Sequence, residues 1–211
     1  MSHETADAAA RRPYHHGDLK AALLAEAEIV LEKEGIQALT LRAAARAAGV
    51  SHAAPKNHFG DLTGLLSELA TLGFTRFSAA LGTAMAEAGD DPRQRIKVMG
   101  RSYVGFATVH PGLFALMFRS EVLDPDRPAL RDSILAARQA LIAAVQARAP
   151  DISISPLQMA AQATALWSLV HGFAMLRLEG RLDGMIRSLP GDETADSLLD
   201  AMLSAIRVVD D

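Results

Sequence analysis

The chain has 211 residues, half of them apolar, which is enough to bury a substantial core in one large domain or in a small and a medium-sized one. Cysteine is absent, which excludes disulfides, thiol catalysis and thiolate metal sites. The formal net charge is only −4, so attraction to nucleic acid must come from local charge patterning. No segment has the pattern of a signal peptide or the length of a membrane span, and this predicts a cytoplasmic protein.

Taken in order, the chain predicts helices and no strands. Apolar residues recur at helical spacing from Asp18 to Glu34, and Gly35 predicts the end of that helix. Sustained period-two alternation is missing, and Val and Ile are scarce beside Ala and Leu. The sequence therefore predicts an all-α fold with about nine helices. After the first helix, the expected ranges are 41–48, 51–58, 61–88, 92–109, 113–119, 129–148, 156–180 and 193–208.

The window between Glu34 and Asp61 contains no acidic residue. Within it, a short Ala-rich helix is expected to end at Gly49, because glycine takes the left-handed conformation without steric cost. Ser51 is expected to cap the following helix, and Ala45 is small enough for the two helices to cross closely. These features predict a helix-turn-helix. Its surplus of basic residues makes double-stranded DNA the first partner to consider.

Two segments of the chain resemble the tetracycline-repressor (TetR) family. The segment 14–66 is similar to the family's DNA-binding head, and Tyr-His-His-Gly-Asp-Leu at 14–19 with Gly-Val-Ser-His-Ala-Ala-Pro at 49–55 is typical of one subgroup. That subgroup also has a Trp-His-Gly signature in its C-terminal domain, which Leu-Trp-Ser-Leu-Val-His-Gly-Phe at 166–173 resembles. The resemblance covers most of the chain.

The resemblance implies an N-terminal three-helix head and a larger C-terminal helical body. We expect a flexible basic arm over 1–17, a helix-turn-helix DNA-binding domain over 18–60, and a ligand-binding and dimerisation domain over 61–211. The boundary falls at the helix that begins at Asp61, so a continuous helix is expected to link the two parts mechanically.

The chain departs from the family at positions that contact DNA. Members usually have an aromatic residue at the position of Lys56, a basic residue or histidine at that of Asn57, and a lysine at that of Leu62. Gly64, in the first turns of the expected helix 61–88, is also a poor helix former. Several phosphate contacts of the family are therefore expected to be missing or relocated.

The candidate DNA-binding residues lie on the basic arm and on outward positions of the helix-turn-helix. Arg42 and Arg46 share a helix face with no acid nearby, which favours phosphate contact over a merely solvated surface. Lys56 fits a base edge or the phosphate backbone equally well, and Asn57 can bond an adenine edge. The arm either enters a minor groove or remains an unstructured tail. The full set is Arg11, Arg12, Thr40, Arg42, Arg46, Ser51, His52, Ala53, Lys56, Asn57 and His58.

The expected helix 156–180 is apolar nearly all round, so both of its sides must be covered. Its own subunit can cover one side, and the last helix can cover only part of the other. A homodimer in which this helix pair forms a four-helix bundle with its mate meets the requirement and agrees with the resemblance. The expected interface residues are Leu166, Leu169, Phe173, Leu176, Leu199, Met202, Leu203 and Ile206.

Aromatic and methionine side chains concentrate in the middle helices, and ordinary core packing accounts for most of them. Polar groups among them favour a ligand pocket for a subset, because pockets are mostly apolar with a few directed donors. His110 is otherwise a helix-end cap, and His171 is otherwise a satisfied core histidine. The candidate ligand-binding residues are Phe77, Tyr103, Phe106, His110, Phe114, Met117, Trp167, His171 and Met175.

The predicted function is a homodimeric, DNA-binding transcriptional regulator, a repressor released from a palindromic operator by a small apolar or amphipathic ligand. The alternative is a small-molecule-binding or interaction protein of the same fold with weakened DNA binding. An enzyme is not expected, because the sequence lacks the G-x-S-x-G, H-E-x-x-H, G-x-G-x-x-G and P-loop motifs. No cofactor or metal is expected, since His15, His16 and Asp18 on a mobile arm are poorly placed for ligation.

Overall fold

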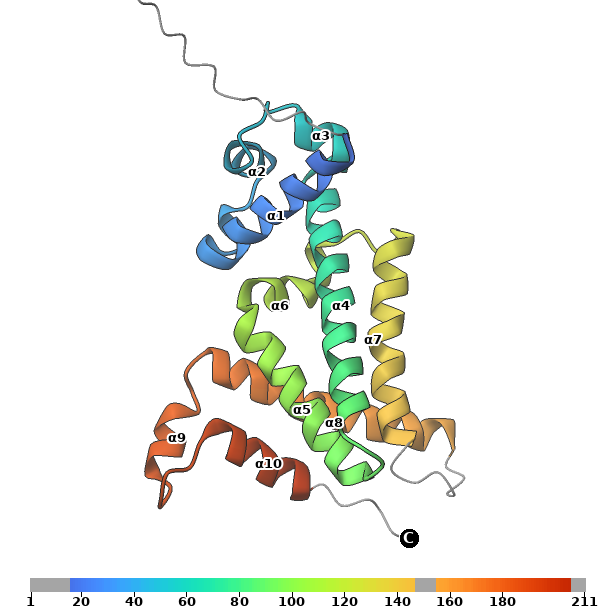
Figure 1. Cartoon of the computed structure of the whole chain (residues 1–211), viewed down its shortest axis with the longest axis vertical. Coiled ribbons are helices and arrows are strands. Elements are labelled where there is room, and N and C mark those ends of the chain that lie inside the picture. Colours follow the sequence, from blue (N-terminus) through green and yellow to red (C-terminus); the bar gives the residue numbers. More distant parts are fainter. Residues whose placement is uncertain (1–15, 147–154, 206–211) are drawn as a thin grey trace, which may run out of the picture.

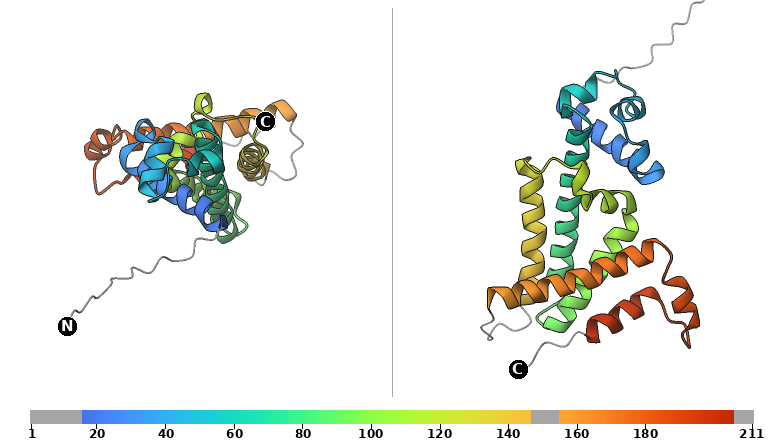
Figure 2. Two further views of the ribbon diagram at one scale, coloured as in Figure 1. Left: turned by 90° about the horizontal axis from the view of Figure 1, so that it is seen from above. Right: turned by 180° about the vertical axis from the view of Figure 1, so that it is seen from behind.

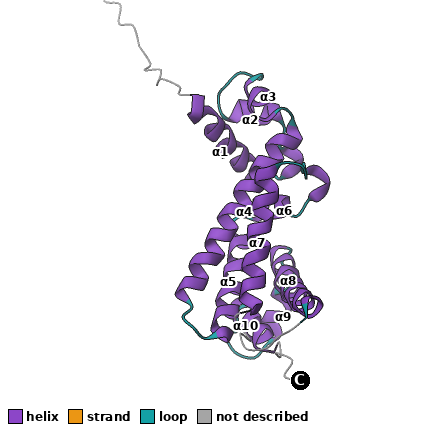
Figure 3. Ribbon diagram, turned by 90° about the vertical axis from the view of Figure 1, so that its right-hand side faces the viewer, coloured by secondary structure: helices purple, strands orange, loops and turns teal. Residues whose placement is uncertain are grey.

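The computed structural model describes residues 16–146 and 155–205, and every regular element within these ranges is a helix (Figure 3). The predicted all-α fold is confirmed. The expectations for Arg11, Arg12 and Ile206 concern residues outside the described ranges.

Ten α-helices and two short 3-10 helices make up the described part of the chain. α9 is missing from the predicted elements, because six residues are too few to show a helical period. The ranges in chain order are α1 (His16–Glu34), η1 (Ile36–Ala38), α2 (Leu41–Ala47), α3 (Ala54–Phe59), α4 (Leu62–Glu87), α5 (Pro92–Val109), α6 (Pro111–Met117), η2 (Ser120–Val122), α7 (Pro128–Gln146), α8 (Pro156–Leu178), α9 (Asp183–Ser188) and α10 (Ala195–Ala205).

The molecule is elongated, with a small head at one end and a larger body at the other (Figure 1). α1, α2 and α3 form the head, and α4 runs from the head through the length of the body. α7 lies along one side of α4, while α5 and α6 pack on its other side. α8 crosses the body over α5 and α7, as the view from behind shows (Figure 2), and α10 packs against α5.

Side-chain caps set the first residue of the helices that position the head. Thr40 Oγ1 accepts a hydrogen bond from the Ala43 amide at 3.0 Å, where α2 begins. Asp61 Oδ1 accepts one from the Gly64 amide at 2.8 Å, where α4 begins. Each cap satisfies an amide that the helix itself leaves unpaired, which contributes about 1 kcal/mol. α4 therefore begins at a defined residue immediately after the helix-turn-helix.

One hydrophobic core continues from the head into the body. Leu31 and Phe59 of the head and Phe114 and Leu199 of the body belong to it, and each is at most 2% exposed. Close-packed cores transmit displacement, because few voids exist to absorb it. A change of packing in the body can therefore be transmitted to the head.

α8 is long and apolar enough to cross a membrane by length and composition, contrary to the prediction that no segment has this length. The same helix packs against α5 and α7, burying Ala163, Leu166, Val170 and Phe173. Only 28% of its most apolar 18-residue window is buried in this single chain. The apolar surface that remains on α8 needs another explanation, which we give below.

Candidate DNA-binding face and aromatic site

Backbone hydrogen bonds close the turn between α2 and α3. Gly49 has a φ of +65°, the left-handed conformation that the sequence predicts. The Val50 amide donates to the Ala45 carbonyl at 3.0 Å, and the Gly49 amide donates to the Arg46 carbonyl at 3.2 Å. This pair of bonds is a Schellman motif, which ends α2. Ala45 is fully buried, so α3 can pack close to α2.

The prediction that Ser51 caps the second helix is wrong. α3 begins at Ala54, its N-cap residue is Ala53, and no side chain caps it. The Ser51 carbonyl accepts the Ala54 amide at 3.0 Å, so the amide that the serine hydroxyl would bind is already paired. Pro55, in the first turn, has no amide to satisfy. The Ser51 side chain is exposed and stays a predicted DNA contact.

Three cations lie on the outer surface of the helix-turn-helix. Arg42 and Arg46 on α2 and Lys56 on α3 are exposed. None of the three forms an ion pair with another residue in the described part of the chain. Their positive charge is therefore directed to solvent, as a phosphate-binding surface requires.

The other predicted DNA contacts surround these cations. His58 is half-buried, and its ring centroid lies 6.2 Å from that of Phe59. The remaining members of the set are exposed, namely Thr40, Ser51, His52, Ala53 and Asn57.

Two acidic residues of α1 contact the body. Glu28 pairs with Arg76 of α4. Glu32 accepts two hydrogen bonds from the first turn of α6, one from the Gly112 amide at 2.7 Å and one from the Leu113 amide at 3.0 Å. A carboxylate is favourable at a helix N-terminus, where amides are unpaired and the helix dipole is positive. The head is thus bonded to both α4 and α6.

Glycine permits the close approach of α6 to α1. A Cβ atom on Gly112 would lie 2.7 Å from the Leu31 carbonyl oxygen, which is closer than such contacts occur. Any larger residue at this position would separate α6 from α1 and lengthen the bonds to Glu32. Sequence reasoning gives no sign of this contact, because the two segments lie 80 residues apart.

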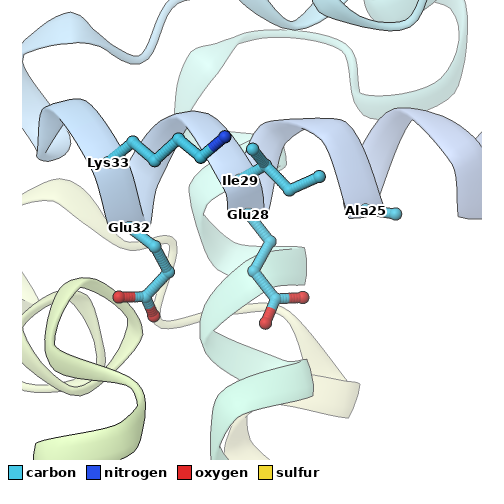
Figure 4. A pocket seen from close by; sticks show the side chains of 5 residues that line it. All are labelled: Ala25, Glu28, Ile29, Glu32 and Lys33. Carbon is cyan, nitrogen blue, oxygen red and sulfur yellow. The ribbon is translucent and has the colours of Figure 1, made fainter.

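A shallow hollow of about 370 Å³ lies along α1. Figure 4 shows the carboxylates of Glu28 and Glu32 projecting together from the helix toward α4 and α6, while Lys33 and Ile29 extend from its other side. Both carboxylates are already bonded to the body. We therefore interpret this hollow as the seam between head and body, and not as a ligand site.

A second link joins the head to the loop before α7. Arg127 donates to the Phe59 carbonyl from Nη2 and to Glu68 from Nη1, each at 3.3 Å, and Glu68 also pairs with Lys20 of α1 at 3.0 Å. These contacts explain Gly64. A Cβ there would lie 2.0 Å from the Phe59 carbonyl oxygen and 2.6 Å from Arg127 Nη2, so packing requires glycine in spite of its low helix propensity.

Three polar side chains meet inside the body. The Tyr103 hydroxyl of α5 lies 2.9 Å from His171 Nδ1 of α8. The Trp167 indole N–H donates to the same hydroxyl at 3.2 Å. Tyr103 is 6% exposed, His171 is half-buried, and Trp167 is 42% exposed. The structure therefore brings together three of the predicted ligand residues, at a place where the interior of the body meets its surface.

Phenylalanine rings surround this polar trio. The ring centroid of Tyr103 lies 5.0 Å from that of Phe77 and 5.7 Å from that of Phe114, both in edge-to-face geometry. Phe118 is missing from the predicted ligand residues, although its ring lies 4.6 Å from that of His171. Its spacing of four residues from Phe114 was the available signal, since such pairs share a helix face.

Phe106 and His110 extend the aromatic cluster toward the end of α5. The centroid of Phe106 lies 5.3 Å from that of Phe77 and 5.0 Å from that of His110. The His110 side chain forms no cap on either neighbouring helix, and its backbone amide bonds to the Phe106 carbonyl at 2.9 Å. His110 is nevertheless the C-cap residue of α5 and the N-cap residue of α6, so its alternative role at a helix end is confirmed through its backbone and not through its side chain.

Burial sets the protonation of the trio. It raises the pKa of Tyr103 well above its ordinary value, an effect that the hydrogen bond from Trp167 partly offsets, so the phenol keeps its proton. Burial lowers the pKa of His171, so the imidazole is neutral at physiological pH. The trio is thus uncharged, in keeping with its aromatic surroundings.

Two predicted ligand residues lie away from the cluster. Met175 is 37% exposed on α8 and takes no part in the hydrogen bonds of the trio, so its ligand role stays a prediction. Met117 is buried against α4, where a Cβ on Gly73 would lie 2.8 Å from its Sδ. Met117 therefore packs the α4–α6 contact, and the cluster consists of the other seven predicted residues together with Phe118.

The predicted dimer residues need a similar correction. Leu166, Phe173, Leu199 and Leu203 are at most 4% exposed within their own chain, so a partner cannot reach them. Their apolar stripes pack against the rest of the body. Three members remain accessible, because Leu169 and Met202 are half-buried and Leu176 is 42% exposed.

The chain is similar to known proteins over most of its length. The model of the tetracyclin repressor-like C-terminal domain matches residues 96–202. A protein of unknown function from Rhodococcus sp. RHA1 is 36% identical, with a TM-score of 0.77 over 92% of this chain and 96% of that chain. Two further solved structures share the fold. One is the TetR family transcriptional regulator PfmR from Thermus thermophilus, which is 19% identical with a TM-score of 0.62 over 88% of this chain and 93% of that chain. The other is a bacterial regulatory protein in the TetR family from Rhodococcus RHA1, which is 18% identical with a TM-score of 0.63 over 88% of this chain and 93% of that chain. Among curated proteins, no match is found.

Proposed function

The chain belongs to the tetracycline-repressor family of DNA-binding transcriptional regulators, and we propose that it is a homodimeric repressor released from its operator by a small apolar or amphipathic molecule. The observation that carries this proposal is the outer surface of α2 and α3. Arg42, Arg46 and Lys56 are exposed there without a counter-ion among the described residues, while Glu28 and Glu32 of α1 are bonded to the body. Within the head, these basic side chains are thus exposed to solvent, while these two acidic side chains contact the body.

This surface has the composition and geometry to bind a duplex. Arg42 and Arg46 lie one turn apart on α2, a spacing suited to neighbouring phosphates of one strand. Lys56 and Asn57 are exposed on α3, which in a helix-turn-helix is the helix that enters the major groove. Asn57 can then bond a base edge, while Lys56 bonds a guanine or a phosphate.

The outer face of α8 supports a homodimer. Leu157 is 79% exposed, Leu176 42% and Met175 37%. In the view from behind, no described helix lies in front of α8 (Figure 2). Large exposed apolar side chains aligned on one helix mark an interaction surface. A second copy related by a two-fold axis covers this face, and it brings two heads to one palindromic site.

We propose that α6 and α4 together carry the response from the body to the head. Phe114 of α6 packs against Tyr103 and His171, and the first turn of the same helix is held by Glu32 of the head. A ligand that displaces Phe114 therefore moves a helix bonded to α1. Only a ligand that prefers the displaced arrangement can shift the equilibrium away from the DNA-binding one.

Titration of a fluorescent operator duplex tests DNA binding. We expect Arg42→Ala combined with Lys56→Ala to weaken binding by roughly tenfold or more at low salt, because two phosphate-directed charges are lost. The matched control is Arg131→Ala combined with Arg138→Ala, which removes two exposed charges from α7. Equal affinity of the two double variants would contradict the proposal.

The alternative function is that of a ligand-binding protein of the same fold with weakened DNA binding. Lys56, Asn57 and Leu62 favour it, since they depart from the family at DNA-contacting positions. Binding to random-sequence duplex at low salt separates the two functions, because a working DNA-binding head retains non-specific affinity. The solved structures that share its fold are transcriptional regulators, which favours a non-enzymatic role. The proposed DNA partner also favours a cytoplasmic location.

A further inference from the structure

The hydrogen bonds of the trio have a defined direction. An indole N–H can only donate, so the Tyr103 oxygen accepts from Trp167. His171 Nδ1, 2.9 Å away, is the one acceptor within reach of the Tyr103 hydroxyl among the described residues, so we assign the hydroxyl hydrogen to it. Nδ1 is therefore the acceptor nitrogen, and in the neutral ring the hydrogen is on Nε2.

The Nε2–H group of His171 is a donor without a partner among the described residues. The hydrogen bond of this side chain within them is the one through Nδ1. The ring is half-buried between Phe118, at 4.6 Å, and Phe114, at 5.5 Å between centroids. A donor fixed in an aromatic setting favours an acceptor that also fits between rings.

The surroundings of this donor are uncharged. Apart from the trio's own members, no acidic or basic side chain within residues 16–146 and 155–205 is hydrogen-bonded to Tyr103, Trp167 or His171. Burial favours the neutral form of both ionisable members of the trio. A charged molecule placed here would lose hydration without gaining a counter-charge, which is costly.

We propose that the effector is an uncharged aromatic molecule with one hydrogen-bond acceptor, such as a carbonyl oxygen, which binds the Nε2–H of His171 while its rings stack against Phe118 and Trp167, the accessible rings of the site. This inference rests on the proposed ligand-responsive function and names the chemical class of the ligand. The aromatic ring of the ligand supplies apolar contact area, and the hydrogen bond from His171 Nε2–H fixes the ligand's orientation.

Four compounds of one shape test the class. They are 2-acetylnaphthalene, which is neutral with an acceptor; 2-isopropylnaphthalene, which has no acceptor; 2-naphthoate, an anion; and 2-naphthamidine, a cation. Trp167 is the only tryptophan of the chain, so the ¹⁵N-labelled full-length protein has one indole N–H resonance, located at the site. We expect the ketone to shift this resonance and to bind roughly tenfold or more tightly than each of the other three.

Two variants check that the preference comes from the trio. His171→Phe keeps a ring and removes the donor, so the ketone should lose its advantage over the hydrocarbon while hydrocarbon binding remains. Tyr103→Phe removes the group that fixes the tautomer, and it should reduce the same preference by less. Far-ultraviolet circular dichroism and thermal melting establish that both variants are folded.

Each other outcome overturns the inference. Tighter binding of the anion or the cation would reject the uncharged class and leave a ligand-responsive regulator standing. Equal binding of hydrocarbon and ketone, or a ketone preference unchanged in His171→Phe, would reject the role of the Nε2–H group. Failure of all four compounds to bind would reject the site as an aromatic pocket, while DNA binding is judged separately by the Arg42 and Lys56 variants.

Discussion

The head and the body place their polar groups in opposite ways. In the head, Arg42, Arg46 and Lys56 are exposed and have no ion-pair partner among the described residues. In the body, Tyr103 and His171 are bonded to each other and enclosed by aromatic rings. Exposed charges act at a distance and are screened by salt, whereas buried polar groups act at contact and depend on fit.

This difference teaches how one chain can respond to two unlike partners. The head suits a long, charged polymer that diffuses to its surface, and the body suits a small uncharged molecule that must enter its interior. The two regions meet where Glu32 holds α6 and where Arg127 holds the end of α3. Variants in each region and at their seam test this division.

Phe114→Ala tests the contribution of the buried cluster. The side chain is fully buried and packs against Tyr103, Phe118 and His171, so its loss should lower the free energy of unfolding by about 3–5 kcal/mol. Urea denaturation measures the change. The control is Val109→Ala, a residue 69% exposed, expected to cost less than about 0.5 kcal/mol. A similar loss of unfolding free energy in the two variants would show that the cluster is not packed as described.

Arg42→Ala, Arg46→Ala and Lys56→Ala in one chain test the exposed face. We expect operator affinity to fall on the order of 100-fold or more and the slope of log affinity against log salt to become shallower by about five, because a dimer loses three charges from each of its two heads. Thermal stability should stay within about 0.5 kcal/mol of wild type, because the three side chains are exposed. A large loss of stability with an unchanged salt slope would assign these residues to folding instead.

Glu32→Gln tests the seam between the regions. An amide in place of the carboxylate removes one of the two acceptors and the charge at the start of α6, at a cost of about 1 kcal/mol. Native-state hydrogen exchange should show faster exchange of the Gly112 and Leu113 amides. Glu34→Gln, at an exposed position on the same helix, should leave both rates unchanged. Unaltered exchange in Glu32→Gln would remove α6 from the proposed coupling.

The pH dependence of stability gives the smallest effect. Burial lowers the pKa of His171 in the folded chain, so the unfolded chain binds the proton first as pH falls through the ordinary histidine value of about 6.5. Wild type should therefore lose stability below that pH relative to His171→Asn, and the two should have parallel profiles above it. Parallel profiles throughout would show that burial does not perturb this group.

Local features of the chain could be predicted from its sequence. The Gly49 turn follows from residues within five positions of it. The cap at Ser51 could not be predicted correctly, because its carbonyl takes the amide that its hydroxyl was expected to bind.

Contacts between distant segments were beyond such reasoning. The trio joins residues 64 to 68 positions apart, and the bond from Gly112 to Glu32 spans 80. Tyr103, Trp167 and His171 could be named as candidates because they are polar side chains among apolar ones, but only the fold shows that they share hydrogen bonds. The apolar stripe of α10 illustrates the limit, since periodicity reveals a buried face without revealing whether its own body or a partner buries it.

Selection of bound sequences from a random DNA pool tests the central claim most directly, namely that the exposed face of α2 and α3 reads DNA in a two-fold dimer. The wild-type chain should enrich a palindrome whose half-sites lie about 34 Å apart or a multiple of this, and the triple variant of Arg42, Arg46 and Lys56 should enrich none. Failure of the wild type to enrich any sequence, or equal enrichment by both proteins, would contradict the account.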